Sequence, residues 1–289
     1  MSNRAAVALT AAVAVGLTVA VSGCRVQVNI GSRTMTDDAR VDGGVTAIDL
    51  RGGDGDVKVE SGPGAGVAIH RSIHYHGKTK PRPGQRVGNG VLTFTKGCSD
   101  CSVDYVLTVP ATMRLKIRNG SGSISVADVA TADVEAGSGD VRVRDVPGPV
   151  RAYTGSGSVR LDSVGGQTDL HAASGDIVAS GVNGGALRAD TGSGSVHLKF
   201  SAPPTNVRAE TGSGDLRLIL PDGAYRIDHS TGSGDENVGI DDDPTAIASV
   251  YARTGSGSIS ILPTDADRRD QVPPAPPAPP VPPAPPVRR

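Results

Sequence analysis

A short glycine-rich phrase recurs eight times between residues 120 and 258, and it constrains the fold more than any other feature of this sequence. The phrase reads Gly-Ser-Gly followed by Ser or Asp, with Ala in place of the first Gly in the fourth copy. Successive copies begin 17 to 23 residues apart, about 19 on average, which is a period typical of solenoids. The sequence therefore predicts a stack of similar coils.

Residues of alternating character flank each phrase. Apolar side chains stand three and five positions before it, as Ile117 and Leu115 do, and Val141-Arg142-Val143 shows that the alternation resumes after it. A period of two on both sides indicates two short strands joined by a Gly-Ser-Gly corner. An aromatic content of only 2% agrees with a thin core, because large rings fill wide interiors.

The alternatives for this pattern are an antiparallel meander and a parallel coil. The first four copies favour a closed coil with three faces, because each places a valine nine residues after its start. We therefore predict an all-β fold, a right-handed parallel β-helix with coils about 4.8 Å apart and irregular N-terminal coils. The four valines are Val129, Val146, Val164 and Val182.

The fourth position of the phrase alternates between Ser and Asp, and in a parallel stack these side chains would form one ladder. Carboxylates 4.8 Å apart repel by about 0.9 kcal/mol even in water, so an intervening Ser relieves the repulsion. The alternative is a chance pattern, and the alternation breaks where Asp215 is followed by Asp235. The predicted ladder is Ser123, Asp140, Ser158, Asp176, Ser195, Asp215, Asp235 and Ser258.

The N-terminal segment carries an export signal. Arg4 precedes an apolar run that ends in Val21-Ser22-Gly23-Cys24, which resembles the lipobox of bacterial lipoproteins. That resemblance implies cleavage before Cys24 and its acylation, which would hold the protein on the outer face of the bacterial cell membrane. An ordinary signal peptide and an uncleaved anchor are the alternatives.

Four segments follow from these patterns. We expect a signal peptide at 1–23, a lipidated N-terminus and linker at 24–44, a solenoid at 45–263 and a proline-rich tail at 264–289. Ten of the 16 residues from 272 to 287 are Pro, which predicts a polyproline II segment.

Two cysteines remain if Cys24 is acylated. Cys98 and Cys101 lie between two alternating runs, so we predict a disulfide that staples the tip of a hairpin. A redox-active C-x-x-C is the alternative, but such motifs normally precede a helix, and none is predicted here.

Two groups of side chains are candidate metal ligands. His70, His74 and His76 share one parity and could hold a soft divalent ion on an outer face. The seventh repeat has His229 and Glu236 at positions that are apolar elsewhere, and it precedes an acidic run that could bind Ca²⁺ with Asp215 and Asp235. In both cases the alternative is an ordinary solvent-facing stretch. The acidic run is Asp241, Asp242 and Asp243.

The segment from Val103 to Val126, with a strand ending in Val109-Pro110 before the first corner, resembles the adhesin-like toastrack family of single-stranded right-handed β-helices. The resemblance extends over roughly Val45 to Leu262, and Gly53 to Asp56 fit the register of an early coil. It implies an envelope location and, for some members, association with membrane-stress signalling. It implies no catalytic residues.

The leading functional prediction is a non-enzymatic lipoprotein whose solenoid displays an adhesin-like surface to a protein or glycan. Outward charged residues with Tyr153 or Tyr251 would form that surface. An envelope-stress regulator that binds a membrane signalling partner is the alternative, followed by a metal-binding envelope protein. Balanced charge, 29 basic against 30 acidic residues, argues against nucleic acid as a partner, and we predict no cofactor.

Overall fold

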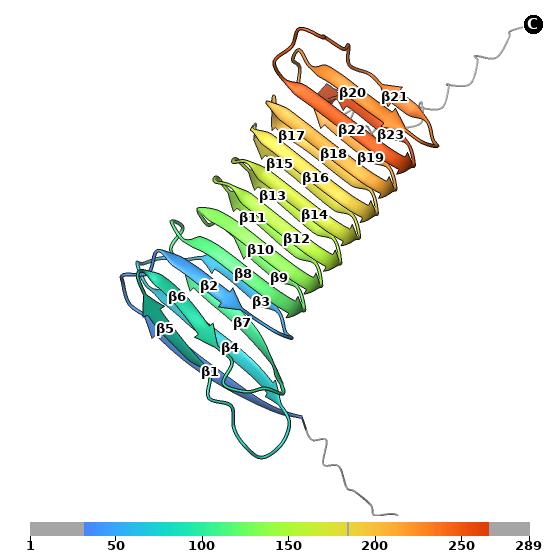
Figure 1. Cartoon of the computed structure of the whole chain (residues 1–289). Coiled ribbons are helices and arrows are strands. Elements are labelled where there is room, and N and C mark those ends of the chain that lie inside the picture. The colour runs from blue at the N-terminus through green and yellow to red at the C-terminus, as the bar shows by residue number, and fades with distance from the viewer. Residues whose placement is uncertain (1–31, 184, 266–289) are drawn as a thin grey trace, which may run out of the picture.

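The computed structural model describes residues 32–183 and 185–265, so Cys24, the signal segment and most of the proline-rich tail lie outside the described residues. The described residues form a β-solenoid in which nearly every coil contributes one strand to each of two sheets (Figure 1). This confirms the predicted all-β, parallel-coil architecture. Within these residues, none of the helices could cross a membrane.

Six regular coils make the middle of the stack. In each, an even-numbered strand lies in the 11-stranded sheet, called sheet B here, and the following odd-numbered strand lies in the 12-stranded sheet, called sheet A. Their strands are β8 (Arg114–Ser121), β9 (Ile124–Ala127), β10 (Thr131–Ser138), β11 (Val141–Val146), β12 (Val150–Ser156), β13 (Val159–Val164), β14 (Thr168–Ser174), β15 (Ile177–Asn183), β16 (Ala186–Ser193), β17 (Val196–Ala202), β18 (Asn206–Ser213) and β19 (Leu216–Leu220).

The coils have two sheet faces, and the prediction of three was wrong. The four valines that suggested a third face, Val129, Val146, Val164 and Val182, are all buried. They lie within two residues of the C-terminal ends of sheet A strands, and each follows a residue with φ between +54° and +64°. That left-handed kink turns the valine inward, so a third sheet is not needed to bury it. The four kinked residues are Asp128, Asp145, Ser163 and Gly181.

The C-terminal coils do not stack in sequence order. After β19 the chain forms the outermost coil, β20 (Arg226–Thr231) and β21 (Glu236–Val238). It then returns to insert β22 (Ser249–Ser256) and β23 (Ile259–Pro263) between that coil and β18/β19 (Figure 1). The unusual seventh repeat is therefore the end cap of the solenoid.

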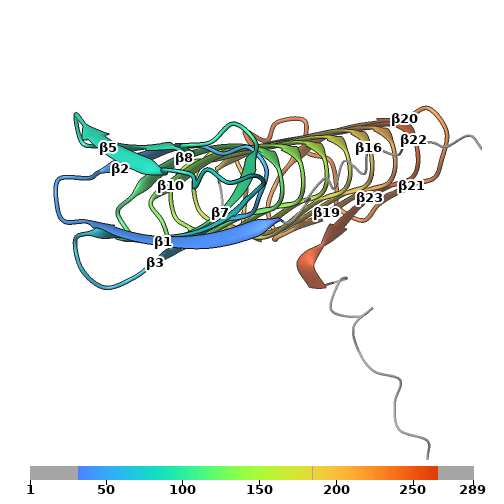
Figure 2. The ribbon, with the colours of Figure 1, turned by 90° about the horizontal axis from the view of Figure 1, so that it is seen from below.

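The N-terminal end has a similar exchange. β2 (Ala47–Arg51) and β3 (Val57–Ser61) pair with β8 and β9, while the intervening chain forms the outer layers (Figure 2). β1 lies antiparallel to β4 over nine residue pairs, and β4 is antiparallel to β7. The outer strands are β1 (Arg33–Val41), β4 (Val67–Tyr75), β5 (Gly84–Gly88), β6 (Val91–Thr95) and β7 (Cys101–Val109).

Two sequence expectations fail at this end. β1 lies inside the segment predicted as a linker. The sequence pattern did not indicate a strand there, because Asp37 occupies an inward position, where it pairs with the buried Arg71. A disulfide does join Cys98 to Cys101, but the strands on its two sides lie in different sheets. It therefore closes a corner between β6 and β7, where a hairpin tip was expected.

Close stacking at the corners explains the invariant second glycine of the phrase. From Gly122 to Gly257 these residues have φ between +103° and +148°. A Cβ at Gly194 would lie 2.3 Å from the carbonyl oxygen of Gly175, the equivalent residue on the coil before. Both the backbone angle and the contact therefore exclude a side chain.

Replacing this glycine tests the stacking directly. Gly194→Ala is expected to lower the free energy of unfolding by about 2 kcal/mol or more, from strain plus a steric clash. The control, Ser193→Ala, removes an exposed hydroxyl from the same corner and should be nearly neutral. Urea unfolding followed by circular dichroism measures both, and equal stability of the two variants would contradict the stacking.

Candidate functional site

The corner ladder is more regular in space than in sequence. Ser258 lies between Asp215 and Asp235, since β23 is inserted between β19 and β21. The apparent break in the alternation therefore disappears. The ladder also gains Asp56 next to Ser123. Its spatial order is Asp56, Ser123, Asp140, Ser158, Asp176, Ser195, Asp215, Ser258 and Asp235.

The side chains of the ladder form hydrogen bonds between neighbouring coils. The Asp140 carboxylate accepts the backbone N–H of Ser158 at 3.0 Å, and Asp56, Asp176 and Asp215 make the same contact at 2.8–2.9 Å. Ser hydroxyls do likewise at longer range, for example from Asp215 N–H to Ser195 Oγ at 3.3 Å. The ladder is therefore structural.

A second ladder inside the corners was missed by the sequence analysis. The Thr191 hydroxyl donates to the carbonyl of Gly175 at 2.9 Å, and four other threonines make the same bond to the adjacent coil of the stack at 2.8–2.9 Å. Since a buried carbonyl without a partner is costly, these threonines stabilise the corner. The available signal was a Thr directly before the phrase in five of the eight repeats: Thr154, Thr191, Thr211, Thr231 and Thr254.

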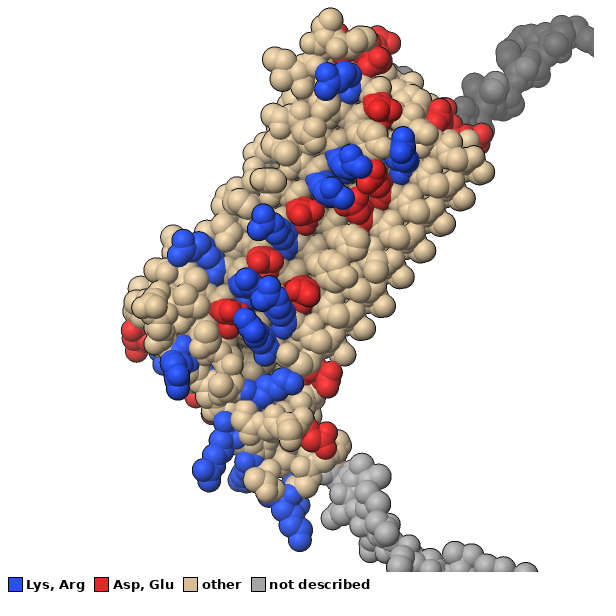
Figure 3. Space-filling model, in the orientation of Figure 1, with Lys and Arg blue, Asp and Glu red and all other residues tan. Residues whose placement is uncertain are grey.

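The outer surface of sheet B, called the sheet B face here, carries charges of both signs along the solenoid axis, and their sign alternates over the five coils from β8 to β16 (Figure 3). Successive coils place Lys116, Asp133, Arg151, Asp169 and Arg188 at equivalent positions. A neighbouring column adds ion pairs such as Arg118–Glu135 at 3.0 Å. Exposed pairs of this kind contribute little to stability.

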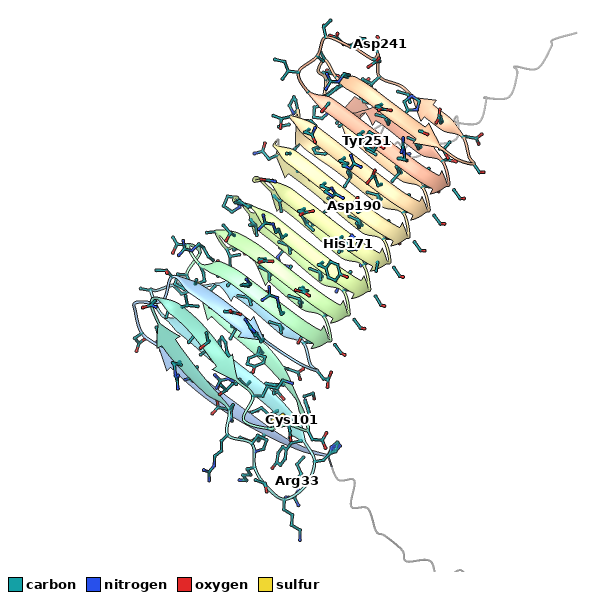
Figure 4. All side chains as sticks on the ribbon, in the orientation of Figure 1. Arg33, Cys101, His171, Asp190, Asp241 and Tyr251 are labelled. Carbon is teal, nitrogen blue, oxygen red and sulfur yellow. A yellow bond between two sulfur atoms is a disulfide. The ribbon has the colours of Figure 1, made fainter. Side chains whose placement is uncertain are left out.

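Two aromatic clusters lie on the same face (Figure 4). Tyr153 stacks on His171 with ring centroids 5.0 Å apart, beside a depression of about 350 Å³ that is also lined by Arg151 and Asp169. Four coils further along, Tyr251 lies under the guanidinium of Arg208 at 4.6 Å. At about 4.8 Å per coil, Tyr153 and Tyr251 are roughly 19 Å apart along the solenoid axis.

The outer surface of sheet A is more basic. Arg142, Arg144 and Arg160 line a depression of about 260 Å³. Asp140 approaches Arg142 at 2.8 Å and Arg160 at 3.7 Å. The Ser158 N–H, followed by these guanidinium groups, holds the pKa of Asp140 below its usual value.

The predicted histidine site is not assembled. His70 and His74 do face outward from β4, but four strand positions separate them by about 13 Å. His70 contacts Asp38 at 2.7 Å and His74 contacts Asp104 at 3.2 Å, while His76 lies beyond the strand. Across residues 32–183 and 185–265, no three His, Cys, Asp or Glu side chains are grouped so as to hold a metal ion.

The acidic run of the seventh repeat serves the end cap. Asp242 accepts the N–H of Ile227 at 2.8 Å and Asp243 accepts the Thr245 hydroxyl at 2.6 Å, whereas Asp241 lies near the end of the molecule (Figure 4). His229 and Glu236 occupy inward positions opposite Ala252 and Ile259. Their 3.3 Å contact closes the last coil, beyond which the described residues form no further coil.

A buried polar cluster closes the opposite end and was also missed. Arg71 is 1% exposed, although it stands on the apolar parity of β4. It pairs with Asp37, donates to Gln85 at 2.7 Å and lies 5.6 Å from the ring centre of Phe94. Burial raises the pKa of the adjacent Tyr105, with Arg71 opposing the shift.

These features define a β-solenoid with corner ladders, two capped ends and long outward faces. The chain belongs to the Toastrack DUF4097 family, whose model matches residues 85–262. Among solved structures, one of a proposed cell adhesion protein from Clostridium sporogenes ATCC 15579 is 12% identical, covers 80% of this chain and all of its own, and has a TM-score of 0.33. One of a proposed adhesin from Bacteroides fragilis NCTC 9343 is 14% identical, with coverages of 79% and 97% and a TM-score of 0.41. No curated protein matches the chain.

Acid titration tests the role assigned to the corner carboxylates. Because the pKa of Asp140 is lowered in the folded state, its contribution to stability is present above the ordinary carboxyl pKa of 3.8 and is lost as the pH falls through the folded value. Asp140→Asn should therefore be less stable than the native chain at neutral pH, and the difference should shrink below pH 3.8.

Asp133→Asn is the matched control, since it removes an outward carboxylate from the sheet B face. It should change stability little at any pH. Urea midpoints measured across the acid range decide the matter, and a pH-independent difference for Asp140→Asn would contradict the assigned role.

Proposed function

We propose that the protein is a non-enzymatic lipoprotein, anchored to the outer face of a bacterial cell membrane through acylated Cys24, that displays the solenoid as an interaction surface. The observation that carries this proposal is the sheet B face, with its alternating charges and two aromatic clusters. An extended protein or glycan lying along the axis would meet equivalent contacts coil after coil.

The contacts of the repeated Ser and Asp residues support a structural role for them, and not a catalytic one. Asp140 and Asp176 accept backbone N–H groups of the next coil, and Ser195 accepts one as well. Side chains committed to such contacts hold the coils in register. The outward columns of sheet B are then the groups left to engage a partner.

The position of the first strand fits an anchor at Cys24. β1 begins at Arg33, nine residues after Cys24, and is paired with β4 along its whole length. Acyl chains on Cys24 would thus tether the N-terminal end of the solenoid, and an anchor of two or more chains is stable.

Substitution of Cys24 tests the anchor. Cys24→Ala should move the protein from the membrane fraction to the soluble extracytoplasmic fraction after a wash in about 0.5 M salt, which screens exposed charges. Cys98→Ser with Cys101→Ser is the control and should stay membrane-bound. If Cys24→Ala remains in the washed membranes, the anchor is disproved.

Crosslinking in cells tests the surface. A photoreactive phenylalanine analogue at Tyr153, which is 42% exposed, should give adducts with a partner. The same group at Ser156, exposed at the corner of the same coil, is the control and should give none. A membrane signalling protein among the Tyr153 adducts would favour the regulatory role. Identical adducts from both positions would argue against the sheet B face.

A further inference from the structure

Basic side chains gather at the N-terminal end of the solenoid. The loop from His76 to Pro83, between β4 and β5, carries Lys78, Lys80 and Arg82, all exposed. Arg33, the first residue of β1, is paired in register with Tyr75, directly before this loop. Figure 3 shows Lys and Arg concentrated at this end, and Figure 4 places Arg33 there. We call Arg33, Lys78, Lys80 and Arg82 the N-terminal basic patch.

The four side chains of the patch have no carboxylate partners among the described residues. Some cations on the solenoid faces, such as Lys58, Arg118 and Arg142, do make ion pairs. The nearby acids are largely committed elsewhere: Asp37 pairs with Arg71, Asp38 with His70 and Asp104 with His74. With these acids paired to other side chains, the patch keeps an excess of positive charge.

The patch also lies close to the proposed anchor along the chain. Nine residues separate Cys24 from Arg33, and a chain of that length spans at most about 32 Å. An acyl anchor at Cys24 would therefore keep these cations near lipid head groups. Cations beside an anionic leaflet strengthen membrane binding about fivefold each, and an acyl anchor is commonly supported by such a second contact.

We propose that the N-terminal basic patch docks on anionic lipid head groups beside the acyl anchor. This inference rests on the proposed function, because the anchor is what brings the patch to the membrane. The two contacts together hold the N-terminal end of the solenoid against the bilayer and leave the sheet B face open to partners.

Vesicle sedimentation tests the patch without the anchor. The chain from residue 25 onward keeps every described residue but lacks Cys24, and it is mixed with phosphatidylcholine vesicles containing about 30% phosphatidylglycerol. It should sediment with these vesicles at low ionic strength, but not with pure phosphatidylcholine, and about 0.5 M salt should release it. Changing Lys78, Lys80 and Arg82 together to Gln should weaken binding at least about tenfold.

The matched control changes Lys116, Arg151 and Arg226 to Gln, which removes the same charge from sheet B and should leave binding within about twofold. Equal loss in both triple variants, or equal binding to neutral vesicles, would overturn the proposal. So would binding to a soluble acidic polysaccharide without binding to anionic vesicles. Because Cys24 is absent here, failure of this test leaves the anchor to be judged by the Cys24→Ala result.

Discussion

The stack depends on how closely the coils approach at their corners. The first and third residues of the phrase are glycine, except for Ala173 in the fourth copy, so the backbone of one coil lies directly on that of the next. A single Cβ at Gly194 would collide with a carbonyl of the neighbouring coil. Such contact leaves N–H and C=O groups that must find partners between coils. The Asp and Ser side chains supply acceptors on the outside of the corner, and the threonines supply donors inside it.

Because the coils share one backbone structure, their outward side chains can differ from coil to coil. Because corners and core hold the stack together, packing constrains the outward positions of sheet B less than the inward ones. We propose that their charges, with Tyr153 and Tyr251 in two clusters, serve recognition. The two ends are closed by different means, a buried Arg71 cluster at one and the His229–Glu236 contact at the other.

Repetition made much of the fold predictable, and its irregular parts show where prediction stopped. The strand period and the composition of the corners indicated parallel coils, because each repeat has the same alternation of apolar residues and the same turn residues. The exchanged coils could not be foreseen, since β20 and β22 have nearly the same pattern and only the polar His229 and Glu236 set the capping coil apart. β1 was missed because Asp37 occupies an inward position. The corner at Cys98–Cys101 was predicted as a hairpin because alternating strands on both sides of a short loop are also typical of a hairpin.

The order of the C-terminal coils is the most direct test, because the unbroken Asp–Ser ladder depends on it. In the chain from residue 25 onward, cysteines at Ser213 and Ser256 should form a disulfide under mild oxidation, since these residues are register partners on adjacent coils. Cysteines at Ser213 and Ser233 should not, because a whole coil separates β18 from β20. Mass spectrometry of the unreduced protein distinguishes the pairs. Efficient closure of Ser213 with Ser233, and not with Ser256, would show sequential stacking and contradict this account.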